Sequence, residues 1–442
     1  MQERRMSSLR TGANPMRVSR PLNYLLSTSL RRPSQPLVAS LMASRYPPPQ
    51  NFPFLILSFF QTADAQWTND DKDLIFVGLD TTRRRLGHCY CTNRASAIYK
   101  INLFEQLLLA QKKEKEKEKE EESIKNEKTK EREEDVDETV KLSTPDDMAT
   151  ISPRLSPNGN RLIYFSYPSL DNHNNCARLR LIERKDGQSD FSSADAQTIV
   201  DIDDTPAELH SFPGFYFSSP GEQDVNWLDD DIIVFASLWR SIRKALIVDI
   251  PKRAVEVASV GTVKGLGESG GMGDNAEGYS WKVHASSRQG YILAAIGTPN
   301  RPDRPVLGRV STVNVDNKEK RVVEWTAFPI TPRQNNLNTK RQEVEDWMAG
   351  VSWEILQVAP STNSDATRHE GERRSFEAVV VSPPATATPT PLLVIPHGGP
   401  HSCYAAEFSI RNLYFVSLGY KLLLGNLFLS FLIPVATYII NS

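Results

Sequence analysis

Leu392-Leu393-Val394-Ile395-Pro396-His397-Gly398-Gly399-Pro400-His401 is the stretch that decides the fold class of the C-terminal part of the chain. Its first four residues are apolar, which predicts a central strand buried on both faces. Residues 405–418 have helical spacing that ends at Gly419, and residues 420–424 begin another strand. A strand, a glycine turn, a helix and a strand make a βαβ unit, so we expect an α/β layer here.

The glycine turn after this strand is the candidate site. An acyl-transfer enzyme needs backbone N–H groups aimed at a developing oxyanion, and glycines let the backbone approach the substrate closely. In α/β-hydrolases one such donor comes from the loop after the third strand. The alternative is a tight turn closed by glycines, with no catalytic role.

The two histidines of this turn do not predict a metal site. His397 and His401 are four residues apart, a spacing that could bind zinc on a helix. The Gly398-Gly399-Pro400 run between them excludes a helix. We interpret His397 as a hydrogen-bonding residue that shapes the loop, and we predict no metal and no cofactor.

Upstream of the glycine turn, a polar turn followed by a short apolar strand and then a second strand recurs. Three copies begin at Trp67, Leu155 and Asn226, and a weaker fourth begins at Trp281. Such units favour β-propeller blades over a generic β-sandwich, although insertions make them longer than the usual ~40–50 residues. The expected strands are 74–77, 97–101, 162–165, 178–182, 232–235, 245–249, 281–283 and 291–293, with two more at 353–358 and 376–381.

The composition is that of an ordinary globular protein, with 39% hydrophobic residues, 24% charged residues and a net charge of −2. Nothing in this charge balance indicates binding to nucleic acid or to an anionic membrane. The 29 prolines and 23 glycines favour strands and turns over a helical bundle. The four cysteines (Cys89, Cys91, Cys176 and Cys403) do not form a dense disulfide pattern, so we predict reduced thiols and a cytoplasmic location.

Both ends of the chain have unusual compositions. Residues 1–50 are rich in arginine and serine with a single acidic residue, Glu3, which resembles an organelle-targeting segment. An apolar run and the small-x-small sequence Ala63-Asp64-Ala65 follow, but too far from the start for an ordinary signal peptide. Leu422–Ile440 carries no charge and is long enough to be a transmembrane candidate, which Pro434 weakens.

Several motifs occur together in the order and context of one family. They are Cys91-Thr92-Asn93-Arg94-Ala95-Ser96-Ala97, Ser152-Pro153-Arg154-Leu155-Ser156-Pro157, Tyr167-Pro168-Ser169-Leu170, Phe376-Glu377-Ala378 and Pro396-His397-Gly398-Gly399-Pro400-His401-Ser402. Over residues 65–426 the chain resembles the acylaminoacyl-peptidases of the prolyl oligopeptidase clan.

The resemblance implies both a fold and an activity. It implies a seven-bladed propeller that caps an α/β-hydrolase domain, with about four blades represented here. It implies release of an N-acylated amino acid from a blocked peptide through an acyl-enzyme. It also implies that the N–H of Gly399 is an oxyanion donor, in a loop with His397, Gly398 and Pro400. An N-acylated peptide is then the expected partner, and a homo-oligomer is compatible with this prediction.

The chain departs from the family after Asn426. In the family a serine, an aspartate and a histidine follow the glycine turn in that order. Here Leu427-Phe428-Leu429-Ser430 replaces the aromatic-Arg-Gly-Ser turn of the family, and we expect no catalytic triad in the chain. We therefore predict that the chain alone is inactive, and we interpret its tail as translated intron or frame-shifted sequence.

Two other functions are compatible with the sequence. The chain could be a non-catalytic propeller module that binds peptides or pairs with a full-length subunit. It could also be a membrane-anchored variant that uses Leu422–Ile440. The resemblance favours a fragment of a hydrolase over both.

Gly267-Glu268-Ser269-Gly270-Gly271 matches the Gly-x-Ser-x-Gly pattern of a nucleophile elbow. Such an elbow needs a buried strand before the serine and a helix after it. Neither Val263–Leu266 nor Gly273–Asn275 has that character, so we do not expect Ser269 to be a nucleophile.

The expected fold is thus mainly β, then α/β: an incomplete propeller followed by the first strands and one helix of an α/β-hydrolase domain. The charged run 112–135 cannot bury a core and is an insertion within the propeller. The expected parts are an N-terminal extension (1–64), the partial propeller (65–345), the start of the hydrolase domain (346–426) and an unrelated apolar tail (427–442).

Overall fold

The computed structural model describes fifteen segments of the chain: 60–70, 72–80, 94–102, 140–170, 175–185, 190–203, 212–217, 225–266, 277–315, 318–329, 338–358, 376–385, 390–398, 402–426 and 439–440. The N-terminal residues 1–59 and the charged run 112–135 lie outside these segments. The fold in the described part is mainly β, as predicted.

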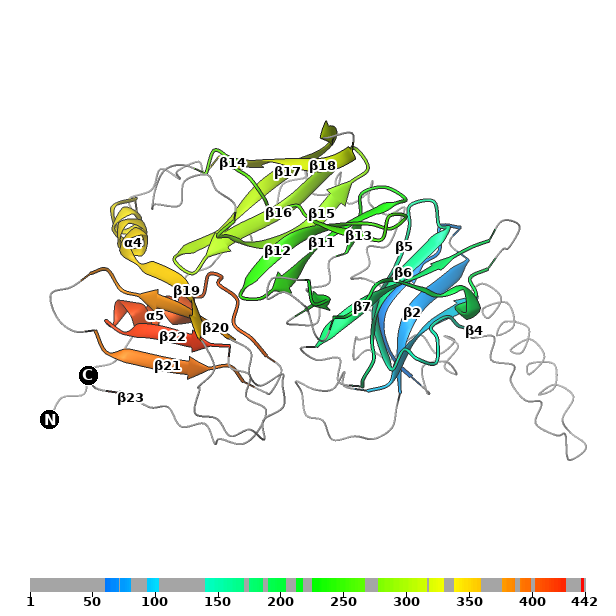
Figure 1. Cartoon of the computed structure of the whole chain (residues 1–442), viewed down its shortest axis with the longest axis horizontal. Helices are drawn as coiled ribbons and strands as arrows, with labels where there is room; N and C mark the ends of the chain where they lie inside the picture. The colour runs from blue at the N-terminus through cyan, green and yellow to red at the C-terminus, as the bar shows by residue number, and fades with distance from the viewer. Residues whose placement is uncertain are drawn as a thin grey trace, which may run out of the picture. The chain divides into compact units, whose positions relative to one another are not determined.

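Residues 60–327 form four consecutive sheets whose sequential strands pair antiparallel (Figure 1). Sheet 1 contains β1 (Phe60–Trp67), β2 (Asp73–Asp80), β3 (Ser96–Asn102) and β4 (Val140–Lys141). Sheet 2 contains β5 (Ala149–Leu155), β6 (Arg161–Tyr167), β7 (Cys176–Glu183) and β8 (Gln197–Val200). Strand β9 (Phe215–Tyr216) also pairs with β7, and a 3₁₀ helix at Ser193–Asp195 precedes β8. Sheet 3 contains β10 (Asn226–Trp227), β11 (Ile232–Trp239), β12 (Ile242–Asp249) and β13 (Ala254–Val257). Sheet 4 contains β14 (Val263–Lys264), β15 (Ser280–Ser287), β16 (Tyr291–Thr298), β17 (Arg301–Val315) and β18 (Lys318–Ala327), where β14 runs parallel to β18.

All eight strands predicted for this region are present, in β2, β3, β6, β7, β11, β12, β15 and β16. The sequence analysis missed the other ten strands of this region, among them the long hairpin of β17 and β18. One face of this hairpin carries polar and charged residues such as Arg309 and Glu324, so the strands have no continuous apolar run. Val263 is fully buried in the two-residue strand β14, but Lys264 beside it is exposed, so β14 is not the buried strand that a nucleophile elbow needs.

The central strands of these sheets have both faces buried. In β11, Ile232, Val234 and Ala236 belong to a core shared with sheet 4, whereas Ile233 and Phe235 belong to a core shared with sheet 2. Because successive side chains of a strand point to opposite faces, each such strand serves two cores. Sheets 1 and 2 share a third core, which includes Ile75 and Tyr164.

The turns that follow β1, β5, β10 and β15 contact one another. The Asn69 side-chain amide donates to the Pro157 carbonyl at 2.8 Å, and the Asn158 N–H donates to the Asp230 carboxylate at 2.8 Å. Arg288 of sheet 4 also reaches the Pro157 carbonyl, at 3.3 Å. These are the recurring polar turns of the sequence, so their Asn and Asp residues bind the next turn as well as shaping their own.

Strands β1, β5 and β15 each carry a β-bulge. The pairing register shifts between Ala63 and Gln66 in β1, between Ile151 and Arg154 in β5, and between Val283 and Ala285 in β15. Within these bulges Asp64 and Ser152 have positive φ, and the Ser152 N–H donates to the Asp64 carboxylate at 3.2 Å. The small-x-small sequence Ala63-Asp64-Ala65 is thus part of a paired strand.

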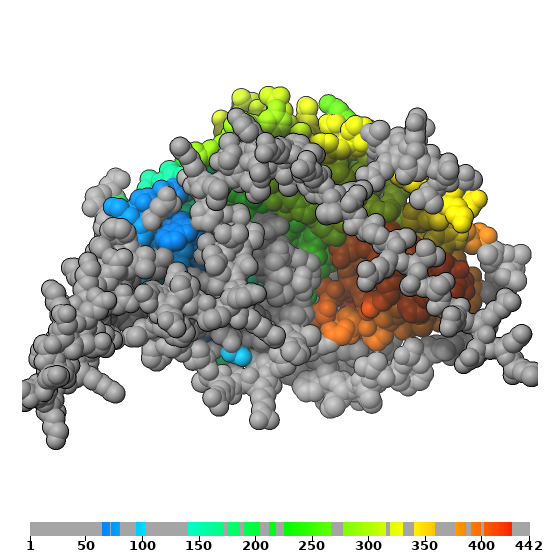
Figure 2. Space-filling model, turned by 180° about the vertical axis from the view of Figure 1, so that it is seen from behind, coloured from blue at the N-terminus to red at the C-terminus, as the bar shows by residue number. Residues whose placement is uncertain are grey.

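Residues 338–426 and 439–440 contain a fifth, mixed sheet and the two α-helices of the described part (orange to red, with α4 in yellow, in Figures 1 and 2). The strand order is β19-β20-β22-β21-β23, and β21 and β22 are parallel. The elements are α4 (Asn338–Gly350), β19 (Ser352–Val358), β20 (Phe376–Ser382), β21 (Leu392–Pro396), α5 (Ile410–Ser417), β22 (Lys421–Gly425) and β23 (Ile439–Ile440).

The predicted unit of strand, turn, helix and strand is present as β21, α5 and β22. Strand β21 was predicted to be buried on both faces, but each of its residues is only partly buried. The helix is shorter than expected. It begins at Ile410 instead of residue 405, because Ser409 caps it by accepting the Asn412 N–H. Gly419 follows it with φ +90°, as the sequence indicated. Helix α4, which contains Trp347, was not predicted from the sequence.

The transmembrane candidate Leu422–Ile440 begins in β22 and ends in β23, and residues 427–438 lie outside the described segments. Among the described residues, no helix has the length and apolar character needed to cross a membrane.

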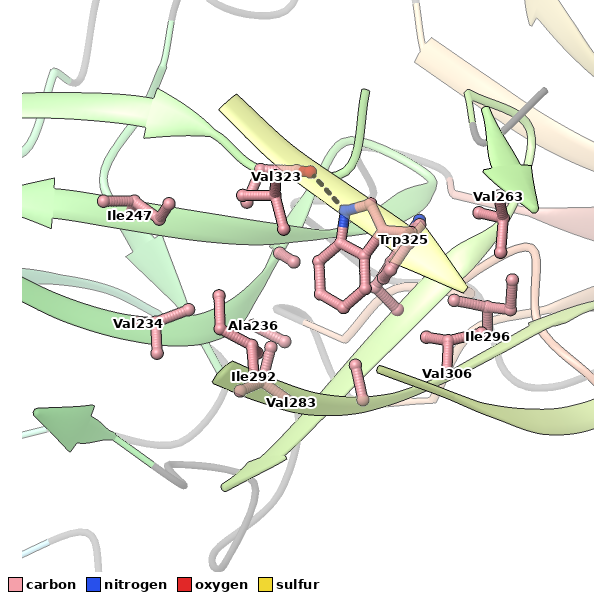
Figure 3. Packing of buried hydrophobic residues seen from close by; sticks show 14 of the residues in the cluster. Val234, Ala236, Ile247, Val263, Val283, Ile292, Ile296, Val306, Val323 and Trp325 are labelled. Atoms are coloured by element: carbon pink, nitrogen blue, oxygen red, sulfur yellow. Dashed lines mark hydrogen bonds between the residues drawn. The ribbon is translucent and has the colours of Figure 1, made fainter. Parts of the chain in front are cut away.

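Trp325 lies at the centre of the core between sheets 3 and 4 (Figure 3). Its indole N–H donates to the Ala258 carbonyl at 2.8 Å, so its one polar atom has a partner inside the core. Gly308 of β17 lies against the indole ring. A Cβ at Gly308 would come within 2.6 Å of Trp325 Cζ3 and 2.8 Å of Val323 Cγ1.

We predict that Gly308→Ala lowers the free energy of unfolding by about 1–3 kcal/mol, because the buried ring must shift to accept the added methyl group. Gly398→Ala is the control, since a Cβ there meets no described atom within 4 Å. Urea denaturation of both variants measures the difference. Equal effects would contradict the close packing at Gly308.

Asp249 of β12 connects sheets 3 and 4 through its carboxylate. This side chain is 3% exposed and accepts from the Arg321 guanidinium of β18 at 2.7 Å and from the Lys252 N–H at 2.9 Å. Burial by itself would raise the pKa of Asp249, but the hydrogen bonds from Lys252 and Arg321 outweigh it and hold the pKa below its ordinary value. The ionised form is therefore the one that stabilises the fold.

We expect Asp249→Asn to destabilise the protein at neutral pH by about 1.5–3 kcal/mol, the range for hydrogen bonds to charged groups. The folded-state pKa of Asp249 is depressed, so its carboxylate contributes fully to the free energy of unfolding above the unfolded-state pKa of about 3.9. This contribution disappears as the pH falls through the folded-state pKa. Urea denaturation at neutral pH and below about pH 3 should show the difference from wild type shrinking in acid.

Glu324→Gln is the matched control for this experiment, because its ion pair with Lys264 is two-thirds exposed at both ends. It should change stability little at either pH. A difference between Asp249→Asn and wild type that does not depend on pH would contradict the role of the carboxylate charge.

Candidate functional site

The candidate site lies at the edge of sheet 5 where the parallel strands β21 and β22 end. Pro396 and Gly425 are paired at that edge. Strand β20 runs in the opposite direction and begins there, with Ala378 beside Gly425. In open α/β sheets, ligands bind beyond the carboxyl ends of the parallel strands, so this edge is where a site is expected.

The structure places two of the four predicted loop residues at this edge. His397 directly follows β21, and its N–H donates to the Gly425 carbonyl at 3.3 Å. Gly398 comes next. Gly399, Pro400 and His401 lie outside the described segments, so the role of Gly399 as an oxyanion donor stays a prediction.

Tyr404 follows this turn in the chain and Asn426 follows β22, and the Tyr404 backbone bonds to the Asn426 side chain. The Tyr404 N–H donates to Asn426 Oδ1 at 2.5 Å, and Asn426 Nδ2 donates to the Tyr404 carbonyl at 2.9 Å. The Tyr404 hydroxyl donates to the Pro396 carbonyl at 3.3 Å. The segment between Pro396 and Tyr404 is therefore tied together at its two ends.

A turn of sheet 3 completes the site, and the sequence analysis did not foresee it. Residues Arg240 and Ser241 join β11 to β12. Ser241 Oγ accepts from Asn426 Nδ2 at 3.0 Å, and the Ser241 carbonyl accepts from the Ala406 N–H at 2.7 Å. The Ser241 N–H donates to Glu377 at 3.0 Å. The polar turn sequence gave no signal of this contact, because its partners are more than 130 residues away.

Arg240 has a backbone conformation that is unusual for an L-residue. Its φ is +61°, in the left-handed region that glycine or asparagine normally occupies. Its guanidinium lies 2.8 Å from the Glu377 carboxylate, and both side chains are less than one-fifth exposed. The ion pair with Glu377 gives a reason for an arginine at a position that glycine would fill with less strain.

Two further contacts join the β sheets to this part of the chain. Ser280 Oγ of β15 donates to the Ala406 carbonyl at 2.8 Å. Asn300, in the turn after β16, donates to the Val351 carbonyl at 2.7 Å. Both Ser280 and Asn300 are buried. The segment around Ala406 is therefore held by hydrogen bonds from both sheet 3 and sheet 4.

A buried cluster of ionisable side chains around Asp147 does not have the character of a functional site. The Asp147 carboxylate is fully buried and accepts from Thr144 and Tyr164, with Arg180 Nε at 3.4 Å. Burial and the nearby Asp147 charge raise the pKa of Tyr164. The carboxylate is satisfied by hydrogen bonds from Thr144 and Tyr164, so we interpret the cluster as structural.

The sequence analysis also considered a metal site and a second serine motif. The described segments contain no group of His, Cys, Asp and Glu side chains that could hold a metal ion. Ser269, the serine of the Gly-x-Ser-x-Gly match, lies outside them.

The order of the parts defines the class of protein: a mainly β module followed by a mixed α/β unit with a glycine turn at the end of a parallel strand. A family model described as the N-terminal domain of acylamino-acid-releasing enzyme matches residues 57–332. Since this match covers more than half of the chain, the chain belongs to the acylamino-acid-releasing enzyme family.

Similar proteins have the same family name. The human acylamino-acid-releasing enzyme is 28% identical over 365 residues, which cover 82% of this chain and 39% of the human protein. Acylamino-acid-releasing enzyme 1 of rice is 26% identical over 366 residues, or 81% and 40% of the two chains. A solved puromycin-hydrolyzing peptidase of Mycobacterium tuberculosis matches with 14% identity and a TM-score of 0.42, over 83% of this chain and 50% of that one. The chain spans about two-fifths of the length of the curated relatives it matches.

We predict that Arg240→Gly is more stable than Arg240→Ala by about 1 kcal/mol. Both variants lose the ion pair with Glu377, but only alanine keeps the strain of an L-residue at positive φ. Urea denaturation of the two variants checks this order. If alanine equalled or exceeded glycine, the left-handed conformation at this turn would be contradicted.

Proposed function

We propose that this chain contributes an incomplete β-propeller and the first strands of an α/β-hydrolase domain to a serine-type acylaminoacyl-peptidase. In this proposal sheets 1 to 4 are four blades and sheet 5 is the start of the hydrolase. Three observations support the blades: the shared faces of successive sheets, the mutual contacts of their first turns, and the bulges repeated in their first strands.

The observation that carries the hydrolase proposal is the position of the glycine turn. The His397-Gly398 sequence directly follows the parallel strand β21, and a helix leads from this turn to the next parallel strand. This is the place where an α/β-hydrolase provides one of its oxyanion N–H donors. We assign that donor to Gly399.

The substrate class follows from family membership. The relatives are named for the release of acylamino acids, so we propose that an N-acylated peptide is the substrate of the complete enzyme. The carbonyl of the acylated residue would accept from the Gly399 N–H while a serine attacks it. The predicted homo-oligomer, and the prediction that neither nucleic acid nor membrane is a partner, stay predictions.

The 442-residue sequence has no Gly-x-Ser-x-Gly elbow after the glycine turn. An oxyanion donor stabilises charge that a nucleophile creates, and it has little to act on without one. We therefore propose that these residues act as part of a catalytic unit whose nucleophile they do not supply.

We predict that the purified 442-residue chain does not hydrolyse acetyl-alanyl p-nitroanilide above the rate in buffer. Release of p-nitroaniline, followed by absorbance, is the measurement. Turnover that a serine-directed phosphonate abolishes would overturn the prediction.

Ser269→Ala is the control that identifies the source of any activity. If turnover disappeared in this variant, the Gly-x-Ser-x-Gly match at 267–271 would be the nucleophile after all. If turnover persisted unchanged, another serine would have to be sought by labelling with the phosphonate.

A further inference from the structure

We propose that the outer face of sheet 4 is the surface through which two copies of this chain associate. The outer face is the side of β16, β17 and β18 that points away from the core shared with sheet 3. On the other side of these strands, Ile292, Val306 and Val323 point into that core (Figure 3). Because side chains alternate along a strand, the residues next to these three lie on the outer face.

The outer face carries large apolar side chains that are exposed. Leu293 of β16 and Leu307 of β17 are directly paired, and Tyr291 lies two residues before Leu293 on the same face. Val313 and Val322 lie further along the hairpin of β17 and β18. Each of these five side chains is between 36% and 39% exposed. A sheet face that meets only water usually carries polar residues at such positions, so this composition is that of a face covered on assembly.

One charge of each sign lies beside the apolar residues. Arg309 is paired with Glu324 across β17 and β18, two residues along from Leu307. The Arg309 guanidinium also lies 5.7 Å from the centre of the Tyr291 ring, and the Glu324 side chain is two-thirds exposed. A face with both charges side by side complements a copy of itself turned by 180°, because each charge can then meet its opposite. Apolar residues with polar neighbours are also the usual composition of a protein interface.

The other end of the series of sheets offers no free apolar face. A head-to-tail contact would place sheet 4 of one copy against the outer face of sheet 1 of the next. In sheet 1, Ile75 faces sheet 2, whereas Leu74, Phe76 and Ile101 lie on the opposite, outer face. Those three side chains are each less than 5% exposed, so that face is already covered. Packing of sheet 4 on sheet 4 is the remaining arrangement, and such an isologous contact closes at two copies.

Sedimentation velocity of the purified 442-residue chain, over a wide range of concentration, tests this association. We expect the wild-type chain to sediment as a reversible dimer. Leu307→Lys places an ammonium group among the apolar residues, where association would leave it unpaired. It should raise the dimer dissociation constant at least about tenfold. Leu356→Lys is the matched control, because Leu356 lies on β19 of sheet 5 with a similar exposure of 42%, and it should leave the constant unchanged.

Two charge reversals test whether the partner is a second copy. Arg309→Glu makes the outer face acidic and Glu324→Arg makes it basic. Copies of either variant therefore repel one another and should dimerise about tenfold more weakly than wild type. A mixture of the two variants brings faces of opposite charge together, so the mixed dimer should form at least as tightly as the wild-type dimer. Both side chains are exposed, so each variant should keep the wild-type circular dichroism spectrum.

A wild-type chain that sediments as a monomer at every concentration would overturn the inference, and the outer face would then await a different polypeptide. Equal dimerisation of Leu307→Lys and Leu356→Lys would also overturn it, because the interface would lie elsewhere. So would a mixture of the charge-reversed variants that associates no better than either alone. If Leu307→Lys does not fold, the charge reversals still decide, since they change exposed side chains only. None of these measurements uses peptide turnover, so this inference and the proposed peptidase function are tested separately.

Discussion

Burial of both faces of the central strands is the constraint on which the rest of the structure depends. In β6 and β11, neighbouring side chains enter different cores, so neither sheet 2 nor sheet 3 is complete without the sheets on both sides. An antiparallel sheet that packed on one side only would alternate apolar and polar residues. This two-sided packing explains why the runs Leu162–Phe165 and Ile232–Phe235 are continuously apolar. Loss of one sheet would expose the face of the next, so the sheets stabilise one another in series.

Polar groups then fix how the packed sheets meet. Apolar packing tolerates small displacements, but a hydrogen bond or a buried ion pair specifies partners and geometry. Asp249 with Arg321 connects sheets 3 and 4, and the Asn69, Asn158 and Asp230 turns connect sheets 1 to 3. Such contacts add modestly to stability because each replaces bonds to water. Their larger effect is to select one arrangement among several that would bury similar apolar area.

Polar contacts also fix the candidate site, which lies where the edge of sheet 5 meets a turn of sheet 3. The parallel strands β21 and β22 present their carboxyl ends and the glycine turn, as any βαβ unit would. The sheet 3 turn provides Ser241 and Arg240, which reach Asn426 and Glu377 at this edge. An arginine kept at positive φ in that turn indicates that its side-chain contact outweighs the backbone strain. In the proposed peptidase, this turn of the β module would help to hold the edge of sheet 5 where the glycine turn begins.

The sequence by itself determined the type and order of many of the elements. Apolar runs between polar turns located eight strands of the β module, and Leu392–Ile395, Gly419 and the strand after it located the βαβ unit, because these signals are local. The start of α5 was misplaced and α4 was missed, since a serine cap and a largely polar helix give weak local patterns. His397 and Gly398 were found from their motif. The partners Tyr404, Asn426, Ser241 and Glu377 were decided only by the tertiary structure, because hydrogen bonds between residues up to 185 positions apart leave no periodic signal in the chain.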